Sequence, residues 1–315
     1  MRAAVIRDGK VEVNDRPTPT PVGSEVLVAV AGAGVNRADL LQLNGMHPAP
    51  HGWPADIPGL EFAGTVSAVG DRVQSVAEGD RVFGILGGGG HATEIMTVEG
   101  LCVRVPESLD LVEAGGIPEV FITAHDAMVT QAGLRSGERV LIHGVGSGVG
   151  TAAVQIARAL GASTVGTTRT ADKLDRAVEL DLEKAVLAGD DMAERIGEVD
   201  VVLDLVGGTY LQVDVEVCRP QGRIVLVGLL AGASVDLDLG AMLRKRLTLT
   251  GTVLRARPEW QKVQATDAFA HEVVPLLEKG VLKTVVDRVM PLDDVADAYD
   301  LLAANKTFGK VIISM

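Results

Sequence analysis

The sequence Arg139-Val-Leu-Ile-His143 runs directly into Gly144-Val-Gly-Ser-Gly-Val-Gly150 and then into the segment Thr151–Leu160. This order predicts a buried strand, a glycine-rich turn and a helix. Such a turn presents backbone N–H groups and the positive end of a helix dipole to a pyrophosphate, and glycine is needed because a Cβ would hold the phosphates away. The spacing is not the strict G-x-G-x-x-G, so the alternative is a turn that only lets strand and helix pack. The residues expected to hold the pyrophosphate are Gly146, Ser147, Gly148, Val149 and Gly150.

This strand is the first of six apolar runs that are separated by segments long enough to form helices. The pattern is typical of a doubly wound parallel sheet with helices on both faces, which gives the glycine-rich turn the βαβ setting of a dinucleotide site. The expected strands are Arg139–His143, Ser163–Thr167, Ala185–Leu187, Val199–Leu203, Arg223–Val227 and Thr248–Thr252.

The parts of the chain on either side of this series have a different pattern. Before it, short apolar runs such as Glu25–Val30 and Arg81–Gly84 are broken by Pro and Gly, which predicts a compact, mainly β domain. After it come a helical segment at Asp267–Leu277, a second short helix at Leu292–Ala303 and a final strand at Lys310–Ser314. These last elements have no further βαβ partner, so we expect them to return to the first domain. The predicted domains are residues 1–118 with 257–315, and residues 119–256.

Composition and charge exclude several functional classes. The 315 residues include 47% hydrophobic and only 3% aromatic residues, and the net charge is −13 with no basic run, so nucleic acid is not an expected partner. The longest apolar run, Ile224–Val235, is too short to span a bilayer. The two cysteines, Cys102 and Cys218, match no metal-ligand spacing, as expected in a reducing compartment. We therefore expect a soluble cytoplasmic protein that does not bind membranes.

The end of the second predicted strand indicates which dinucleotide binds. NAD-specific sites place an acidic residue there, whereas this chain has Thr168 and Arg169, followed by Lys173 one helical turn later. Hydroxyl and cationic groups favour a 2′-phosphate, so we expect NADPH. The alternative is that both cations are ordinary solvated charges at a helix start. The turns after the fourth and fifth strands are expected to line the nicotinamide half through Gly207, Gly228 and Leu229.

Several separate motifs carry a family resemblance. They are Asn36–Leu40, Gly59–Gly64, Ile117–Glu119, Thr123-Ala124, Ala304–Lys306 and Gly309–Val311. With the glycine-rich turn, they make the chain similar to the medium-chain dehydrogenase/reductase superfamily, and within it to the zeta-crystallin-like NADPH:quinone oxidoreductases. The resemblance implies an α/β protein in which a GroES-like catalytic domain, built from both ends of the chain, accompanies a Rossmann domain that binds NADPH. It also implies a homodimer or homotetramer, for which the apolar strand Leu247–Val253 is the candidate contact.

The same resemblance argues against a metal. Zinc-dependent relatives have Cys at the position of Asn36 and His at that of Leu60, and they insert a four-cysteine lobe that this chain lacks. A zinc-free site suits quinones and conjugated carbonyls, which are already polarised.

Three residues are candidate catalytic groups, and each has a structural alternative. Asn36 is the expected hydrogen-bond donor, or else a helix cap. His47 replaces a tyrosine that is common in the family's quinone reductases, and is either a proton donor or a surface-loop residue. Thr123 is expected near the nicotinamide carboxamide, or is a plain helix hydroxyl. The resemblance places Asn305 and Lys310 close to the cofactor. The expected pocket residues are Trp53, Glu119 and Leu254.

The leading hypothesis is an NADPH-dependent quinone reductase that transfers hydride without a metal. An enone or enoyl reductase is the enzymatic alternative, because that reaction also adds hydride to a conjugated carbonyl. The third hypothesis, of another class, is an NADPH-binding structural or redox-sensing protein with little turnover.

Overall fold

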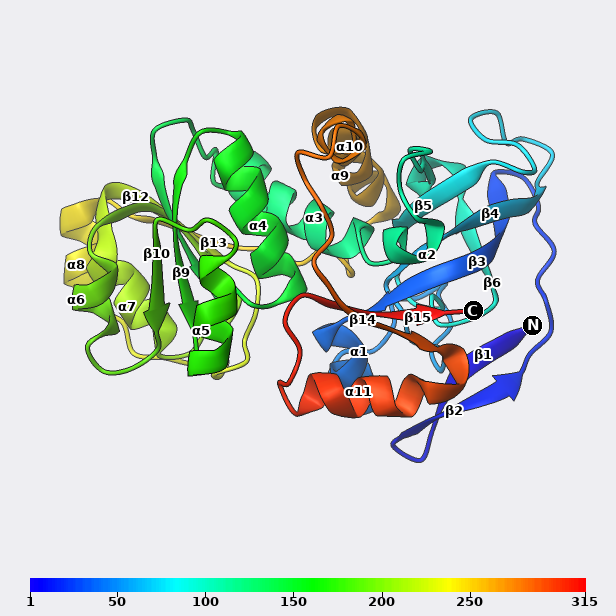
Figure 1. Cartoon of the computed structure of the whole chain (residues 1–315), viewed down its shortest axis with the longest axis horizontal. Helices are drawn as coiled ribbons and strands as arrows, with labels where there is room; N and C mark the ends of the chain where they lie inside the picture. The colour runs from blue at the N-terminus through cyan, green and yellow to red at the C-terminus, as the bar shows by residue number, and fades with distance from the viewer. The chain divides into compact units, whose positions relative to one another are not determined.

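The computed structural model describes all residues from 1 to 315, and the chain forms two compact units (Figure 1). Unit 1 consists of Met1–Ile122 together with Leu254–Met315, and unit 2 is Thr123–Val253. The helix α3 (Pro118–His125) crosses the boundary and continues as a π-helix, η2 (Asp126–Gln131). None of the helices combines the length and apolarity needed to cross a membrane.

Unit 2 contains one sheet of six parallel strands in the order β10-β9-β8-β11-β12-β13, which confirms the predicted doubly wound sheet. The strands are β8 (Arg139–His143), β9 (Ser163–Thr168), β10 (Lys184–Leu187), β11 (Val199–Asp204), β12 (Cys218–Leu226) and β13 (Thr248–Gly251). The helices are α4 (Gly148–Ala159), α5 (Ala171–Val178), α6 (Met192–Ile196), α7 (Tyr210–Val217) and α8 (Leu239–Lys245). Helices α4 and α5 lie on one face of the sheet, and α6, α7 and α8 on the other (Figure 1).

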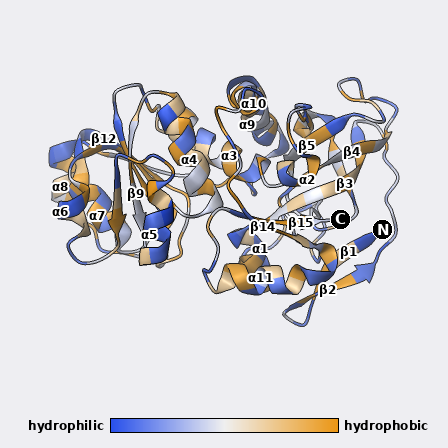
Figure 2. Cartoon of the chain, in the orientation of Figure 1, coloured by the Kyte–Doolittle hydropathy of each residue, from blue (hydrophilic) through white to orange (hydrophobic).

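Burial on both faces explains why these strands are apolar throughout. Val140, Leu141 and Ile142 of β8 are completely buried, and the helices above and below carry hydrophobic and hydrophilic residues on different parts of their surface (Figure 2). The chain order reverses at β8, which lies between β9 and β11. Ligands of open α/β sheets bind beyond the carboxyl end of the strands at such a switch point. The glycine-rich turn that follows β8 is therefore correctly placed for a nucleotide.

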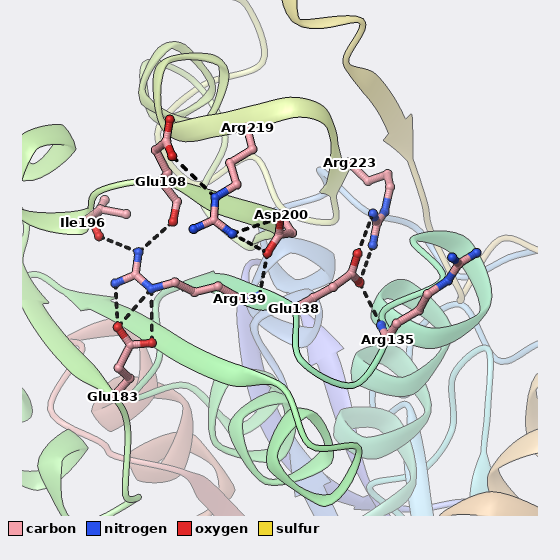
Figure 3. Close-up of polar contacts among 9 residues, drawn as sticks. All are labelled: Arg135, Glu138, Arg139, Glu183, Ile196, Glu198, Asp200, Arg219 and Arg223. Atoms are coloured by element: carbon pink, nitrogen blue, oxygen red, sulfur yellow. Dashed lines mark hydrogen bonds and ion pairs between the residues drawn. The ribbon is translucent and has the colours of Figure 1, made fainter.

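Charged side chains connect strands and loops at the opposite end of the same sheet, where the strands begin (Figure 3). Arg223 donates two hydrogen bonds to the carboxylate of Glu138, at 2.6 and 2.9 Å, and a third to a backbone carbonyl. Arg139 pairs with Glu183, and its backbone N–H donates to Asp200 at 2.8 Å. These residues come from different strands and loops, so the network is an architectural one at the edge opposite the glycine-rich turn.

Unit 1 is built mainly from strands, as predicted, and its main sheet has the order β14-β15-β3-β4-β5-β7, with β6 also paired to β3. The strands are β3 (Glu25–Val35), β4 (Glu61–Val69), β5 (Arg81–Ile85), β6 (Glu94–Val98), β7 (Val103–Arg104), β14 (Val286–Pro291) and β15 (Lys310–Ser314). A separate hairpin joins β1 (Arg2–Arg7) to β2 (Lys10–Asp15) through Asp8 and Gly9, both at positive φ, as a tight two-residue turn requires.

The final strand β15 runs antiparallel to β3, with Val311 opposite Val35. This register sets the last residues of the chain beside the loop at Asn36, and it places the side chain of Lys310 in the interior. Two ends of the chain thereby form one core.

The helices of unit 1 are α1 (Arg37–Leu43), α2 (Leu111–Ala114), α9 (Glu259–Glu272), α10 (Val274–Glu278) and α11 (Val295–Ala303), with 3-10 turns η1 (Glu99–Leu101) and η3 (Leu292–Asp294). Helix α9, with 14 residues, is the longest of them, and α2 and α11 pack against strands of this sheet. The helix predicted over Asp267–Leu277 begins eight residues earlier and is interrupted at Val273. The interruption has a local cause, because Pro275 has no N–H to continue the helical hydrogen bonds.

Candidate functional site

The glycine-rich turn of unit 2 has the geometry of a phosphate cradle. Ser147 caps α4, and its hydroxyl accepts a hydrogen bond from the N–H of Gly150 at 3.0 Å. A Cβ at Gly150 would lie 2.6 Å from the carbonyl oxygens of both Gly144 and Val145, so only glycine allows this approach of helix and turn. The Gly148 and Val149 N–H groups precede the first intrahelical hydrogen bond, from Thr151 to Ser147, so the helix start can offer them to an anion.

The side chain of Val145, in the glycine-rich turn, is fully buried and packs against Gly166 of β9, where a Cβ would lie 2.8 Å from it. This side chain therefore packs inside unit 2 and anchors the turn to the sheet.

The predicted ribose-phosphate group of residues follows β9. Thr168 is buried at the end of the strand and Arg169 is exposed beside it, while Lys173 is buried on the first turn of α5. Burial distinguishes Lys173 from the solvated helix-start charge that was its alternative interpretation. The exposed guanidinium of Arg169 is accessible to a ligand phosphate.

The ends of β11 and β12 form the other side of this edge. Gly207 has a φ of +68°, and a Cβ there would lie 2.6 Å from the carbonyl oxygen of Gly228, so these two predicted residues pack against one another. Asp204 holds the turn, because its Oδ1 accepts from the N–H groups of Val206 and Gly207 at 2.7 and 2.8 Å. Leu229, by contrast, is exposed.

A buried polar chain lies under this turn and was not predicted. His143, at the end of β8, contacts Thr167 through Nδ1 and Asp214 of α7 through Nε2, both at 2.8 Å. Burial raises the pKa of Asp214 to about 6, the charge of His143 opposes this shift, and Asp204 adds to it. One carboxylate oxygen of Asp204 and one of Asp214 are buried without a hydrogen-bond partner, which is unfavourable when both acids are ionised. A proton on Asp214 reduces this cost.

These features fit a bound nicotinamide dinucleotide. The absence of a Cβ at Gly150 lets the start of α4 pack closely against the turn. The hydroxyl oxygen of Thr123 on α3 is buried with no hydrogen-bond partner, which leaves it available to a ligand amide. Gly146, Ser147 and Gly148 belong to the same turn and would hold the pyrophosphate.

Unit 1 contains a second polar site, which is centred on an ion pair in the interior. Lys310 Nζ lies 2.6 Å from Glu61 Oε1, 2.8 Å from Asn36 Oδ1 and 3.1 Å from the carbonyl oxygen of Val35. Asn36 Nδ2 donates to Glu61 at 2.9 Å and to Gly34 O at 3.1 Å. The structure thus brings together two predicted residues, Asn36 and Lys310, through an acid that prediction did not single out.

This bonding limits what Asn36 can do. Both hydrogens of its amide are already donated, so Asn36 holds Glu61 and Lys310 in place rather than offering a free donor. It also precedes α1, but the carboxylate of Asp39 closes that helix start by accepting from the Asn36 N–H at 2.7 Å. Leu60, the other residue at a zinc-ligand position of the relatives, is buried and has no ligating atom.

Glu119 lies next to the ion pair. Its backbone N–H donates to Glu61 Oε2 at 2.9 Å, whereas its carboxyl group makes no hydrogen bond or ion pair. Burial, followed by the negative charge of Glu61, raises the pKa of Glu119 to about 8, although Lys310 acts in the opposite direction. At neutral pH this residue is therefore mostly a neutral carboxylic acid with a proton to donate.

Arg255 is a further residue of this part of unit 1, and sequence reasoning did not identify its role. Its guanidinium donates to the carbonyl oxygens of Gly87 and His47 at 2.8 and 2.7 Å and to Gln42 Oε1 at 2.5 Å. The loop that carries His47 is thus anchored by its backbone. Burial and then the charge of Arg255 lower the pKa of His47, with Asp39 opposing them, so the imidazole is neutral at physiological pH.

The other predicted pocket residues lie in the same unit. Trp53 is partly buried, and a Cβ at Gly87 would lie 2.5 Å from its ring, so this glycine lets the indole lie against the loop. Lys262 of α9 lies 5.3 Å from the centre of the Trp53 ring. Leu254 is buried. Asn305 adopts a positive φ of 56° in the turn after α11.

The chain matches two family models that together cover most of it. One, described as "Alcohol dehydrogenase GroES-like domain", covers residues 23–129, and the other, described as "Zinc-binding dehydrogenase", covers residues 148–269. A curated "Quinone oxidoreductase" from Sus scrofa is 31% identical over 95% of this chain and 92% of its own length.

Two solved structures extend this comparison. The quinone oxidoreductase of Pseudomonas syringae pv. Tomato DC3000 has a TM-score of 0.88 at 27% identity, and the match covers all of both chains. The CurK enoyl reductase has a TM-score of 0.84 at 29% identity, over 97% of this chain and 95% of that one.

Proposed function

The chain belongs to the medium-chain dehydrogenase/reductase family and is quinone oxidoreductase-like, and from this premise we propose that it is an NADPH-dependent, metal-free reductase of quinones. The observation that carries the proposal is the hydrogen-bonded group of Asn36 with the buried pair Glu61 and Lys310, and with Glu119 beside it. It puts an acid that retains its proton next to Glu61, which Asn36 and Lys310 hold in place. An acceptor that is already polarised needs a proton and orientation rather than a Lewis acid.

The nicotinamide supplies hydride when it is bound, and the residues of this chain supply binding and the proton. The turn from Gly146 to Gly150 would hold the pyrophosphate, and Thr123 would receive the carboxamide. Hydride and one proton convert a quinone to its hydroquinone, so the acceptor gains two electrons and two hydrogens. We assign the proton to Glu119, whose carboxyl group has no competing partner, and keep His47 as the alternative donor. Asn36 and Lys310 are positioning residues that fix Glu61, and hence the backbone of Glu119.

The preference for NADPH rests on Thr168, Arg169 and Lys173. Their hydroxyl and cationic groups complement a 2′-phosphate, which an acid at the same place would repel. The preference for NADPH is independent of which acceptor is reduced.

An enone or enoyl reductase is the second candidate, and the similarity to CurK enoyl reductase favours keeping it. This reaction requires a proton on the α-carbon after hydride addition, whereas a hydroquinone oxygen can take its proton from water. Loss of the proton donor should therefore reduce enone turnover much more than quinone turnover.

The decisive experiment measures steady-state NADPH oxidation with an ortho-quinone, a para-quinone and an open-chain enone, with NADH as the cofactor control. The native protein is compared with Glu119→Gln and with His47→Gln. Turnover of quinones alone supports the proposal, and enone turnover that collapses in Glu119→Gln supports the second candidate. Tight NADPH binding without turnover of any acceptor would instead favour a structural or redox-sensing protein.

We also propose that the protein is a homodimer or homotetramer joined through the edge strand β13. This edge is exposed and carries Leu249, with Val253 just beyond it and Leu239 and Leu243 of α8 nearby. Light scattering on the native protein and on Leu249→Lys tests this, because the charge should convert the assembly to smaller species. The unpaired cysteines support a reducing compartment, and we propose the cytoplasm.

A further inference from the structure

Lys262 is a largely buried lysine whose ammonium group has no anionic partner. Its side chain is on α9 in unit 1, and only 3% of the residue is exposed. The ammonium group lies 5.3 Å from the centre of the Trp53 ring, and it makes no hydrogen bond or ion pair within the chain. A lysine in such a position normally has a carboxylate or several carbonyl oxygens around it, because an unpaired buried charge is costly. A cation–π contact recovers only a part of this cost.

The charges around Lys262 do not neutralise it. Arg255, which is also buried, acts on it with a like charge and uses its donors on backbone and amide oxygens rather than on a carboxylate. Lys310 already has Glu61 as its partner. The acids that act on Lys262 are Glu119 and Glu259, which raise its pKa, whereas burial, as the largest effect, and Arg255 lower it.

Neither acid balances the positive charge. Glu119 retains its proton at neutral pH, because its pKa is raised to about 8, and Glu259 lies at the exposed first turn of α9. Asp39 is close enough to raise the pKa of Arg255 but forms no ion pair with it. This side of unit 1 therefore has a surplus of buried positive charge.

We propose that Lys262 and the Trp53 ring form a subsite for a planar conjugated molecule that carries an ionised oxygen group. The ammonium has three free donors for a carboxylate, sulfonate or phenolate oxygen, and such a charged hydrogen bond removes the unpaired charge. The indole, which Gly87 allows to approach its loop closely, provides the wall for the planar part. The proposed subsite rests on the proposed function, because we take the molecule that binds there to be the acceptor. The binding step needs neither nicotinamide nor turnover.

A redox-inert pair of probes separates charge from shape. Naphthalene-1-sulfonate carries the anion, and naphthalene-1-sulfonamide is its neutral analogue of the same shape. Binding is measured by calorimetry on the full chain without nicotinamide. Fluorescence is followed in a Trp260→Phe background, in which Trp53 is the only remaining tryptophan.

The native protein should bind the sulfonate and quench Trp53. Lys262→Met should weaken sulfonate binding by about tenfold to a hundredfold, the range for a hydrogen bond to a charged group, and change sulfonamide binding less than twofold. Lys262→Arg should retain most of the affinity. The matched control is Lys279→Met, since Lys279 is an exposed lysine after α10 and its loss should leave both affinities unchanged.

Equal weakening of both probes in Lys262→Met, or no preference of the native protein for the sulfonate, would overturn the proposal. Melting curves identify a folding defect, which is not expected, because replacing an unpaired buried charge by an apolar side chain of similar length is neutral or stabilising.

Turnover is then compared for 1,2-naphthoquinone-4-sulfonate and 1,2-naphthoquinone. Selective sulfonate binding without reduction of either quinone would leave the subsite standing and refute the reductase. Reduction of both quinones with no dependence on Lys262 would support the reductase and refute the subsite.

Discussion

Replacing Lys310 by Met removes the ammonium that pairs with Glu61 in the core of unit 1. The two side chains are only 3% and 0% exposed, and their charged atoms are 2.6 Å apart. Removing one partner leaves a buried carboxylate without its counter-ion, which costs about 3–5 kcal/mol. For a unit of this size, each kcal/mol lowers the melting temperature by about 2–4 °C. We therefore expect Lys310→Met to melt roughly 6–20 °C below the native protein.

Differential scanning calorimetry of the full chain is the assay, and the two units are followed separately if their transitions separate. Two further variants make the result interpretable. The double variant Glu61→Gln with Lys310→Met removes both charges and should recover half or more of the loss. Arg2→Met breaks the exposed pair between Arg2 and Asp293, in which the side chains are 50% and 64% exposed, and it should cost about 0–1 kcal/mol. A Lys310→Met variant as stable as Arg2→Met, or a double variant less stable than Lys310→Met, would refute this reasoning.

Three other predictions concern the nucleotide turn and the acid. Arg169→Ala should weaken NADPH binding by about tenfold to a hundredfold and leave NADH binding nearly unchanged by fluorescence titration, and equal losses would remove the 2′-phosphate assignment. Gly150→Ala should weaken both cofactors equally and lower the melting temperature, because its Cβ would meet the carbonyl oxygens of Gly144 and Val145 at 2.6 Å; unchanged binding would refute the cradle. The pKa of Glu119 is raised in the folded protein from its usual 4.5 to about 8, so the unfolded chain releases this proton first and the native protein loses stability as pH rises between these values. Urea unfolding should therefore show Glu119→Gln gaining stability relative to the native protein from pH 5 to pH 8, and a constant difference would contradict the raised pKa.

The nucleotide half of the molecule is predictable from sequence because its contacts are local. The strand, the turn and the helix that contain Gly144–Gly150 are consecutive, and apolar runs that are buried on both faces identify the remaining strands without knowledge of their neighbours. The helix break at Val273 was missed although its cause, Pro275, is visible in the sequence. The burial of His143 and Asp214 was missed because their contact joins β8 to α7, which are far apart in sequence.

The polar group of unit 1 could not be predicted from spacing. Lys310 is 274 residues from Asn36 and 249 from Glu61, and it reaches them only because β15 pairs with β3 in one register. A shift of one residue would direct the lysine to the other face of the sheet. Resemblance to a family identified Asn36 and Lys310 separately, but only the structure joins them. Lys262 gave no signal at all, since a lysine on a helix is normally exposed.

The structure also changes which residue is expected to donate the proton to the acceptor. His47 was attractive because an unperturbed imidazole titrates near neutral pH, but its pKa is lowered by burial and by Arg255, so the protonated form is scarce where it would be needed. Glu119 is affected in the opposite way, because burial beside Glu61 disfavours its charged form and keeps the proton in place. Both shifts arise first from burial, which disfavours the charged form of an imidazole and of a carboxyl group alike. A site with this electrostatic bias holds neutral donors and unpaired cations, a combination suited to an acceptor that becomes negative as it is reduced.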